Sequence, residues 1–219
     1  RRLIVELPCR AGSVWHLRLA RGWDTWDLVA CFAFDQKPGG EAPDLVTFTL
    51  PMERLGLDPS RTYWAFEFWS GQFLGTVPGG RTNPGGYTHP GDWQDLVVPG
   101  PAGTLNFRFA GPGVKLVALR EKRPHPWVVG TSFHQSCGAE LDEVTWDAVK
   151  GELRGILRRP AGQTGSVFIC DAGWRSVSAE TGGQQIPMIP GAGGVWKLSM
   201  VTSRSAIPWQ VVFGGPVAT

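Results

Sequence analysis

The sequence predicts an all-β protein: an antiparallel, Greek-key-like β-sandwich with two β units and minimal helix. Three observations support this fold class. Apolar and polar residues alternate with a period of two in most segments, as half-buried strands require. Glycine and proline account for 30 and 18 of the 219 residues, and they cluster between those segments. The hydrophobic content of 42% is sufficient for a core of one large or two small β domains.

The candidate strands of the first half are recognised by alternation and by aromatic content. Trp15 and Leu17 alternate with His16 and Arg18 in the first of them. A short helix of one or two turns is predicted at residues 51–56, because Pro51 suits a first helical turn and Gly56 suits a terminator. The strands predicted in this half are 14–20, 26–34, 44–50, 62–69, 72–77, 104–109 and 114–120.

The second half has a hairpin rhythm of its own, with short apolar strands separated by turn residues. A turn at residues 147–150, for example, separates two of its strands. The strands predicted here are 127–131, 141–146, 152–157, 166–170, 195–200 and 207–213.

A charged joint containing proline, Lys122-Arg123-Pro124, divides the chain. We therefore predict a β-sandwich domain at 1–123, followed at 124–219 by a second β unit or an extension of the same sandwich. Residues 78–93 are rich in glycine and proline and form a long loop, which composition marks as disordered or loosely packed.

The charge and hydropathy of the chain argue against two classes of partner, nucleic acid and membranes. The net charge of +2 argues against nucleic acid, and no apolar run is long enough to span a membrane.

The four cysteines, Cys9, Cys31, Cys137 and Cys170, are widely spaced. Two disulfides are possible, but the spacing does not require them. We expect a cytoplasmic location, with secretion left open, because a domain of this size needs no disulfides. The chain starts without Met, which suggests a processed or excised piece.

No group of residues supports a catalytic, cofactor-binding or metal site. Asp24 and Asp27 lie near Trp23 and Trp26, and Asp92 and Asp95 flank Trp93, but turn and strand-end roles explain both pairs. His134 and Cys137 have a spacing that zinc sites use, but no second pair completes a tetrahedral set.

The surplus of aromatic residues, with 11 Trp and 11 Phe, is the one feature that points to binding. Exposed aromatic faces stack on sugar rings, although core or interdomain packing is the favoured explanation. The candidate carbohydrate or interdomain contacts are Trp64, Trp69, Trp93 and Trp174.

Several segments resemble the C-terminal β domains of α-galactosidase-like glycoside hydrolases, a clan that includes melibiases and raffinose synthases. The aromatic strand at 63–69, YWAFEFW, is followed by Phe73-Leu74-Gly75 as in those domains. The other similar segments are 26–35 (WDLVACFAFD), 113–120 (GVKLVALR) and 125–135 (HPWVVGTSFHQ). The similarity covers residues 26 to about 135 and becomes weaker through Trp146.

This resemblance implies a non-catalytic domain that caps or stabilises a (β/α)₈ catalytic barrel of the same parent chain, which itself is a glycoside hydrolase. The family's catalytic aspartates belong to the barrel, so they match no position here. The alternative is a free-standing, lectin-like carbohydrate-binding module. An independent β-fold enzyme is a third interpretation. Self-association through surplus aromatic surface is also expected.

Overall fold

The computed structural model describes residues 2–6, 13–33, 46–78, 97–99, 104–109 and 113–216. Within these ranges the protein is all-β, and the only helical segments are two short 3-10 turns, at Met52–Leu55 and Ala192–Gly194. All strand pairs with a described register are antiparallel. The predicted fold class is therefore confirmed.

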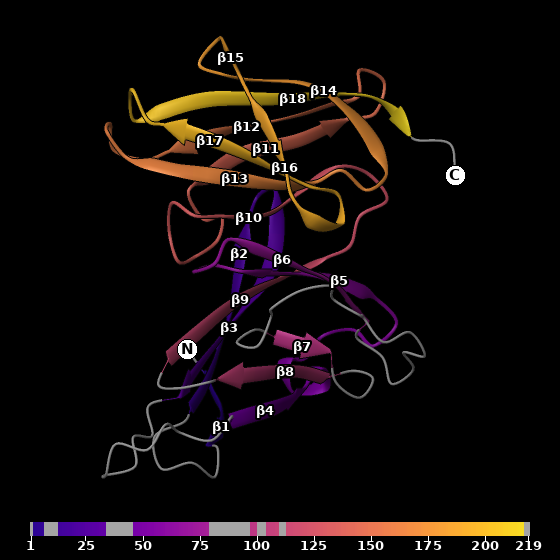
Figure 1. Ribbon diagram of the computed structural model, residues 1–219, viewed down its shortest axis with the longest axis vertical. Coiled ribbons are helices and arrows are strands. Elements are labelled where there is room, and N and C mark those ends of the chain that lie inside the picture. The colour runs from indigo at the N-terminus through magenta and orange to yellow at the C-terminus, as the bar shows by residue number, and fades with distance from the viewer. Residues whose placement is uncertain are drawn as a thin grey trace. The chain divides into compact units, whose positions relative to one another are not determined.

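The chain forms two compact units (Figure 1). The first consists of Arg1–Arg18, Asp27–Trp69 and Leu74–Lys122. The second consists mainly of Arg123–Thr219, together with two short segments from earlier in the chain, Leu19–Trp26 and Ser70–Phe73. Whether 1–123 and 124–219 are separate domains stays a prediction.

A six-stranded and a three-stranded sheet hold the strands of the first half. The six-stranded sheet has the order β1-β2-β3-β9-β5-β6, with bounds Arg2–Glu6, Ser13–Arg21, Asp24–Ala33, Gly113–Glu121, Thr62–Glu67 and Gln72–Pro78. The three-stranded sheet has the order β4-β8-β7, with bounds Val46–Pro51, Thr104–Phe109 and Val97–Pro99.

The second unit is a sandwich of a four-stranded and a five-stranded sheet (Figure 1). The four-stranded sheet has the order β10-β13-β17-β16: Trp127–Thr131, Thr164–Cys170, Val195–Val201 and Met188–Pro190. The five-stranded sheet has the order β11-β12-β18-β14-β15: Leu141–Asp147, Glu152–Arg158, Ala206–Pro216, Trp174–Thr181 and Gln184–Ile186. The last strand, β18, lies between β12 and β14, so distant parts of the sequence share one sheet.

Alternation determines the two faces of the five-stranded sheet. In β18, Ile207, Trp209, Val211 and Phe213 are buried, and the residues between them are more exposed. Strand β12 follows the same rule, with buried residues at Leu153, Gly155 and Leu157. One face thus packs in the core of the sandwich, and the other, which includes residues 154, 156, 208 and 210, carries the candidate site described below.

The predicted strands agree with the observed ones to within a few residues, and 104–109 and 127–131 agree with β8 and β10 at both ends. The predicted helix at 51–56 is a single 3-10 turn that ends at Gly56, whose φ of 66° suits glycine. Five short or polar strands were not predicted: β1, β7, β14, β15 and β16.

Some predictions lie outside the described residues. They include nearly all of the 78–93 loop and, with it, Trp93 and Asp92. Cys9 and Asp95 also lie outside the described ranges. The other three cysteines, Cys31, Cys137 and Cys170, are buried.

Candidate functional site

A chain of aromatic contacts runs through the second unit. The Trp23 ring lies 5.5 Å from that of Trp26 and 6.1 Å from that of Trp127. His125 is 5.5 Å from Trp127 and stacks on Trp146 at the same separation, with an angle of 4° between the ring planes. Trp146 in turn meets Trp174 edge-on at 5.0 Å. Five of the eleven tryptophans therefore pack against other aromatic rings within one unit.

This packing affects the protonation of His125. Burial lowers the pKa of its imidazole below the ordinary value of 6.5, and the nearby Arg123 guanidinium lowers it further. A hydrogen bond to the Pro126 carbonyl acts in the opposite direction without cancelling the effect. The stack on Trp146 therefore holds a neutral ring over a wider range of pH than an exposed histidine would.

The turn between β2 and β3 anchors the segment that follows β10. The Trp26 Nε1–H donates to the Ser136 carbonyl at 2.8 Å, and the Trp23 Nε1–H donates to the Leu141 carbonyl at 2.7 Å. Asp24 accepts from the Arg123 guanidinium at 2.9 Å and from the Trp127 indole at 3.3 Å. These tryptophans therefore have a structural role, because they position residues 136–141.

The four predicted contact residues have different surroundings. Trp64 is only 1% exposed in this structure, as the burial of both sides of β5 requires, and a contact through it stays a prediction. Trp69 is 55% exposed and lies edge-on to Phe68 at 4.9 Å. Trp174 is half-buried against Trp146, and Trp93 lies outside the described residues. A role for any of them in interdomain contact stays a prediction.

Asp27 and His134, which the sequence analysis weighed as catalytic or metal-binding residues, form hydrogen bonds with neighbouring residues. Asp27 accepts from Arg18 at 3.0 and 3.2 Å and lies 2.5 Å from His16 Nε2. His134 Nδ1 accepts from the backbone N–H of Ser136 at 3.1 Å, and no metal-binding group of three or more His, Cys, Asp or Glu residues occurs among the described residues.

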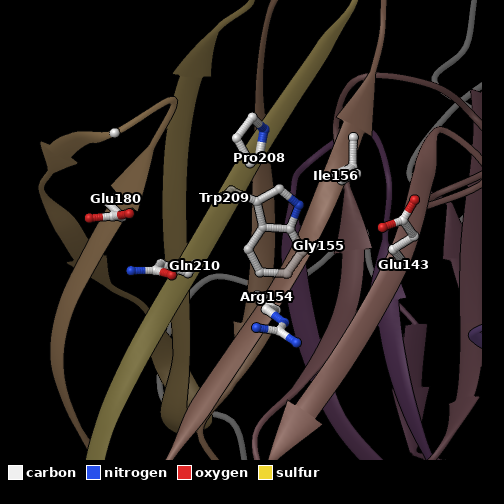
Figure 2. Close-up of a pocket in the computed structure, with 9 residues that line it drawn as sticks. Glu143, Arg154, Gly155, Ile156, Glu180, Pro208, Trp209 and Gln210 are labelled. Carbon is white, nitrogen blue, oxygen red and sulfur yellow. The ribbon is translucent and has the colours of Figure 1, made fainter.

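A groove of about 170 Å³ on the solvent-facing side of the five-stranded sheet is the candidate binding site (Figure 2). Its polar side chains are Glu143 from β11, Arg154 from β12, Glu180 from β14 and Gln210 from β18. In the view of Figure 2, Glu180 and Glu143 lie on opposite sides of the residues that line the groove. Ile156 and Pro208 add apolar surface to the same groove.

Close packing of Gly155 and Trp209, which both line the groove, fixes this part of the sheet. The two residues are cross-strand partners, and a Cβ on Gly155 would lie 2.8 Å from the Trp209 ring. Only glycine leaves space for the indole there. Strand β11 is irregular between Asp142 and Thr145, and Glu143 adopts a positive φ of 53° within this bulge.

The groove offers hydrogen-bonding groups that are not used internally. The side chains of Glu143, Glu180 and Gln210 make no hydrogen bond to any other described residue. Arg154 is held by the Thr145 hydroxyl and the Glu152 carboxylate, both at 3.3 Å. Planar polar groups beside an apolar surface are the chemistry that sugar hydroxyls and sugar C–H faces require.

Sequence analysis did not identify these groove residues. Arg154 and Ile156 could have been assigned to the exposed face of β12 by alternation alone. Their neighbours Gln210 and Glu180 come from strands that are distant in the sequence, and β14 was itself not predicted.

Comparison with known proteins provides no assignment: no protein-family model matches the chain, and a search of curated proteins finds no similar sequence. Among the described residues, no helix has the length and apolarity needed to cross a membrane.

Proposed function

We propose that this chain is a non-catalytic β domain of an α-galactosidase-like glycoside hydrolase, where it packs on and stabilises a (β/α)₈ catalytic barrel. The antiparallel all-β architecture is consistent with the proposal, as is the placement of the segments that resemble those domains. Three of these segments form β3, β5 and β9, which belong to one sheet.

One observation carries this proposal: the outward side of β2 is apolar. Trp15 and Leu17 are 40% and 38% exposed, and the polar residues that alternate with them, His16 and Arg18, lie on the opposite side of the strand. His16 and Arg18 both bind the buried Asp27 carboxylate. A strand with polar groups paired internally and large apolar groups outside is typical of a surface that another domain covers.

The coding sequence upstream of Arg1 tests the proposal most directly. We expect it to encode about 250 residues of alternating strands and helices, the size of a barrel. A stop codon immediately upstream would overturn the proposal. In the longer protein, Trp15→Ser and Leu17→Ser should lower the melting temperature, and Val177→Ser, which removes an exposed side chain of the second unit, should not.

The groove of Figure 2 supports a second candidate, a carbohydrate-binding module. This candidate uses polar side chains around Ile156 and Pro208 rather than exposed tryptophans. Arg154 and Gln210 are the side chains that we expect to hydrogen-bond sugar hydroxyls.

Titration calorimetry with galactose and raffinose distinguishes the two candidates. A binding module should take up at least one of these sugars, and Gln210→Ala should weaken binding by roughly tenfold. Lys197→Ala, an exposed change on the other sheet, is the matched control. Absence of saturable binding would exclude these sugars as ligands and leave the barrel-associated role as the proposal.

A further inference from the structure

The structure has a second hollow, of about 380 Å³, in the second unit, and its electrostatic character is opposite to that of the groove. Three arginines line it: Arg21 at the end of β2, Arg158 at the end of β12, and the adjacent Arg159. Its volume falls in the range of about 300–1,000 Å³ that is typical of small-molecule sites. Both the hollow and the groove of Figure 2 are lined by two carboxylates, but the groove has a single arginine.

Several hydrogen bonds hold the wall of this hollow. The buried Glu140 carboxylate accepts from the hydroxyls of Thr131 and, at 3.0 Å, Ser136. The Ser136 hydroxyl also accepts from the Ala139 N–H at 3.1 Å. Together with the Trp26 bond to the Ser136 carbonyl, these contacts fix the segment from both sides.

The two carboxylates that line the hollow already accept hydrogen bonds from neighbouring residues. Glu140 receives two hydroxyl donors, and Asp142 accepts from Arg158 Nε at 2.5 Å. Arg159 is held differently, through its Nε on the Gln163 side-chain oxygen at 2.8 Å. Two guanidinium groups are therefore oriented through Nε, and their terminal N–H groups form no hydrogen bond with the described residues.

Arg21 and His134 contribute further donors. Arg21 makes no hydrogen bond or ion pair within the part of the chain that the structure describes. His134 Nδ1 accepts the Ser136 N–H, which leaves Nε2 as the N–H donor of the ring. The hollow thus combines three guanidinium groups and an imidazole N–H with two carboxylates that are already hydrogen-bonded, Glu140 to two hydroxyls and Asp142 to Arg158.

We propose that this hollow binds a tetrahedral oxyanion, a phosphate or sulfate group that is either free or carried on a small molecule. Guanidinium groups bind such anions through paired, charge-assisted N–H···O bonds. A carboxylate, with two oxygens and one charge, uses fewer of these donors than a phosphate does. The anion site is independent of the proposed function, since neither a barrel nor the groove takes part in it.

Titration calorimetry at constant ionic strength tests the site, with inorganic phosphate, inorganic sulfate, glucose 6-phosphate and glucuronate as probes. We expect saturable binding of phosphate or sulfate and weaker binding of glucuronate. Tighter binding of glucose 6-phosphate than of inorganic phosphate would support a group carried on a sugar, and equal binding would support the free ion. No saturable binding of any tetrahedral anion, or equal binding of glucuronate, would overturn the proposal.

Two variants and one control make the test specific. Arg21→Gln should weaken phosphate binding by roughly tenfold without loss of folding, because Arg21 has no partner among the described residues. Arg159→Gln should have a similar effect. Arg175→Gln removes an exposed arginine of β14 that lines neither the hollow nor the groove, and it should leave the affinity within about twofold. If Arg175→Gln reduces binding as much as Arg21→Gln does, the binding is non-specific charge attraction and the proposal fails.

Discussion

At the scale of single residues, the tryptophans of the β2–β3 turn act as hydrogen-bond donors as well as core residues. Trp26 is buried, and its indole N–H is the partner of the Ser136 carbonyl. Removal of a donor to a buried carbonyl leaves the carbonyl unsatisfied, which costs more than the hydrogen bond itself contributes.

We expect Trp26→Phe to lower the free energy of unfolding by about 2–4 kcal/mol, from the lost donor and the smaller ring. Trp69→Phe, at an exposed position, should change it by no more than about 0.5 kcal/mol. Chemical denaturation followed by circular dichroism measures both values. Equal effects of the two variants would show that the indole N–H at position 26 has no special role.

His125 provides a test that depends on pH. Its lowered pKa means that the unfolded chain takes up a proton first as pH falls through 6.5. The stability that the neutral ring contributes is therefore complete above pH 6.5 and is lost as pH falls toward the folded-state pKa. NMR titration of the His125 ring should give a pKa below 6.5.

The variant His125→Phe keeps an aromatic ring against Trp146 but cannot titrate. The difference in unfolding free energy between the natural protein and this variant should therefore shift against the natural protein between pH 8 and pH 5. A titration midpoint at or above 6.5, or a difference that does not depend on pH, would contradict the assignment.

At the scale of elements, one turn contains a residue that is poorly suited to its backbone. Between β13 and β14, Ala172 and Gly173 both have positive φ, of 50° and 83°, and the Trp174 N–H donates to the Asp171 carbonyl at 2.9 Å. The β14–β15 hairpin places Gly182 and Gly183 at φ values of 56° and 84°, nearly the same conformation. Alanine therefore stands where the other turn has glycine.

Ala172→Asn should raise the free energy of unfolding by about 0.5–1 kcal/mol, because asparagine tolerates the left-handed region better than alanine. The reverse experiment, Gly182→Ala, should destabilise the protein by a similar amount. Thermal unfolding should show shifts in opposite directions, of about 2–4 °C per kcal/mol for a chain of this length. Shifts of the same sign would mean that side-chain contacts, rather than backbone conformation, control these turns.

Strand prediction succeeded for strands whose own side chains show an apolar or alternating pattern. It failed for strands that are defined only by backbone pairing with a neighbouring strand. Strands β10 and β8 are apolar or alternating, and their bounds were predicted without error. Strand β14 is rich in serine, and β15 and β16 have three residues each, so only backbone pairing with a partner strand defines them. The sequence contains no local signal of that pairing.

The same reasoning explains why the sequence did not predict the residues of the groove. Alternation indicates that Arg154 lies outside the core, but it cannot indicate that β18 pairs with β12 and brings Gln210 beside it. Alternation also left open, for Trp64, whether the side chain packs in the core or contacts another domain or a sugar. Strand β5 has aromatic or apolar residues at successive positions, so no polar face identifies its solvent side.

At the scale of the whole molecule, the large exposed apolar residues of the first unit differ in kind from those of the second. The first unit exposes Trp15, Leu17 and Trp69, two of them aromatic. The second exposes only aliphatic side chains of this kind among its described residues, for example Val177 and Ile189. Large aromatic surfaces stabilise protein–protein contacts more than isolated aliphatic ones do.

We therefore expect the chain by itself to self-associate as its concentration rises, through the aromatic surface of the first unit. Sedimentation velocity over a range of concentrations measures this directly. Trp15→Ser and Trp69→Ser should each shift the distribution toward monomer, and Ile189→Ser should leave it unchanged. Trp64→Ser should instead lower the free energy of unfolding, because that side chain is buried. Two outcomes would show that these aromatic residues form no contact surface: a chain that stays monomeric at every concentration, or an Ile189→Ser variant that relieves association as well as Trp15→Ser does. The proposed docking on a barrel would then lose the observation that carries it.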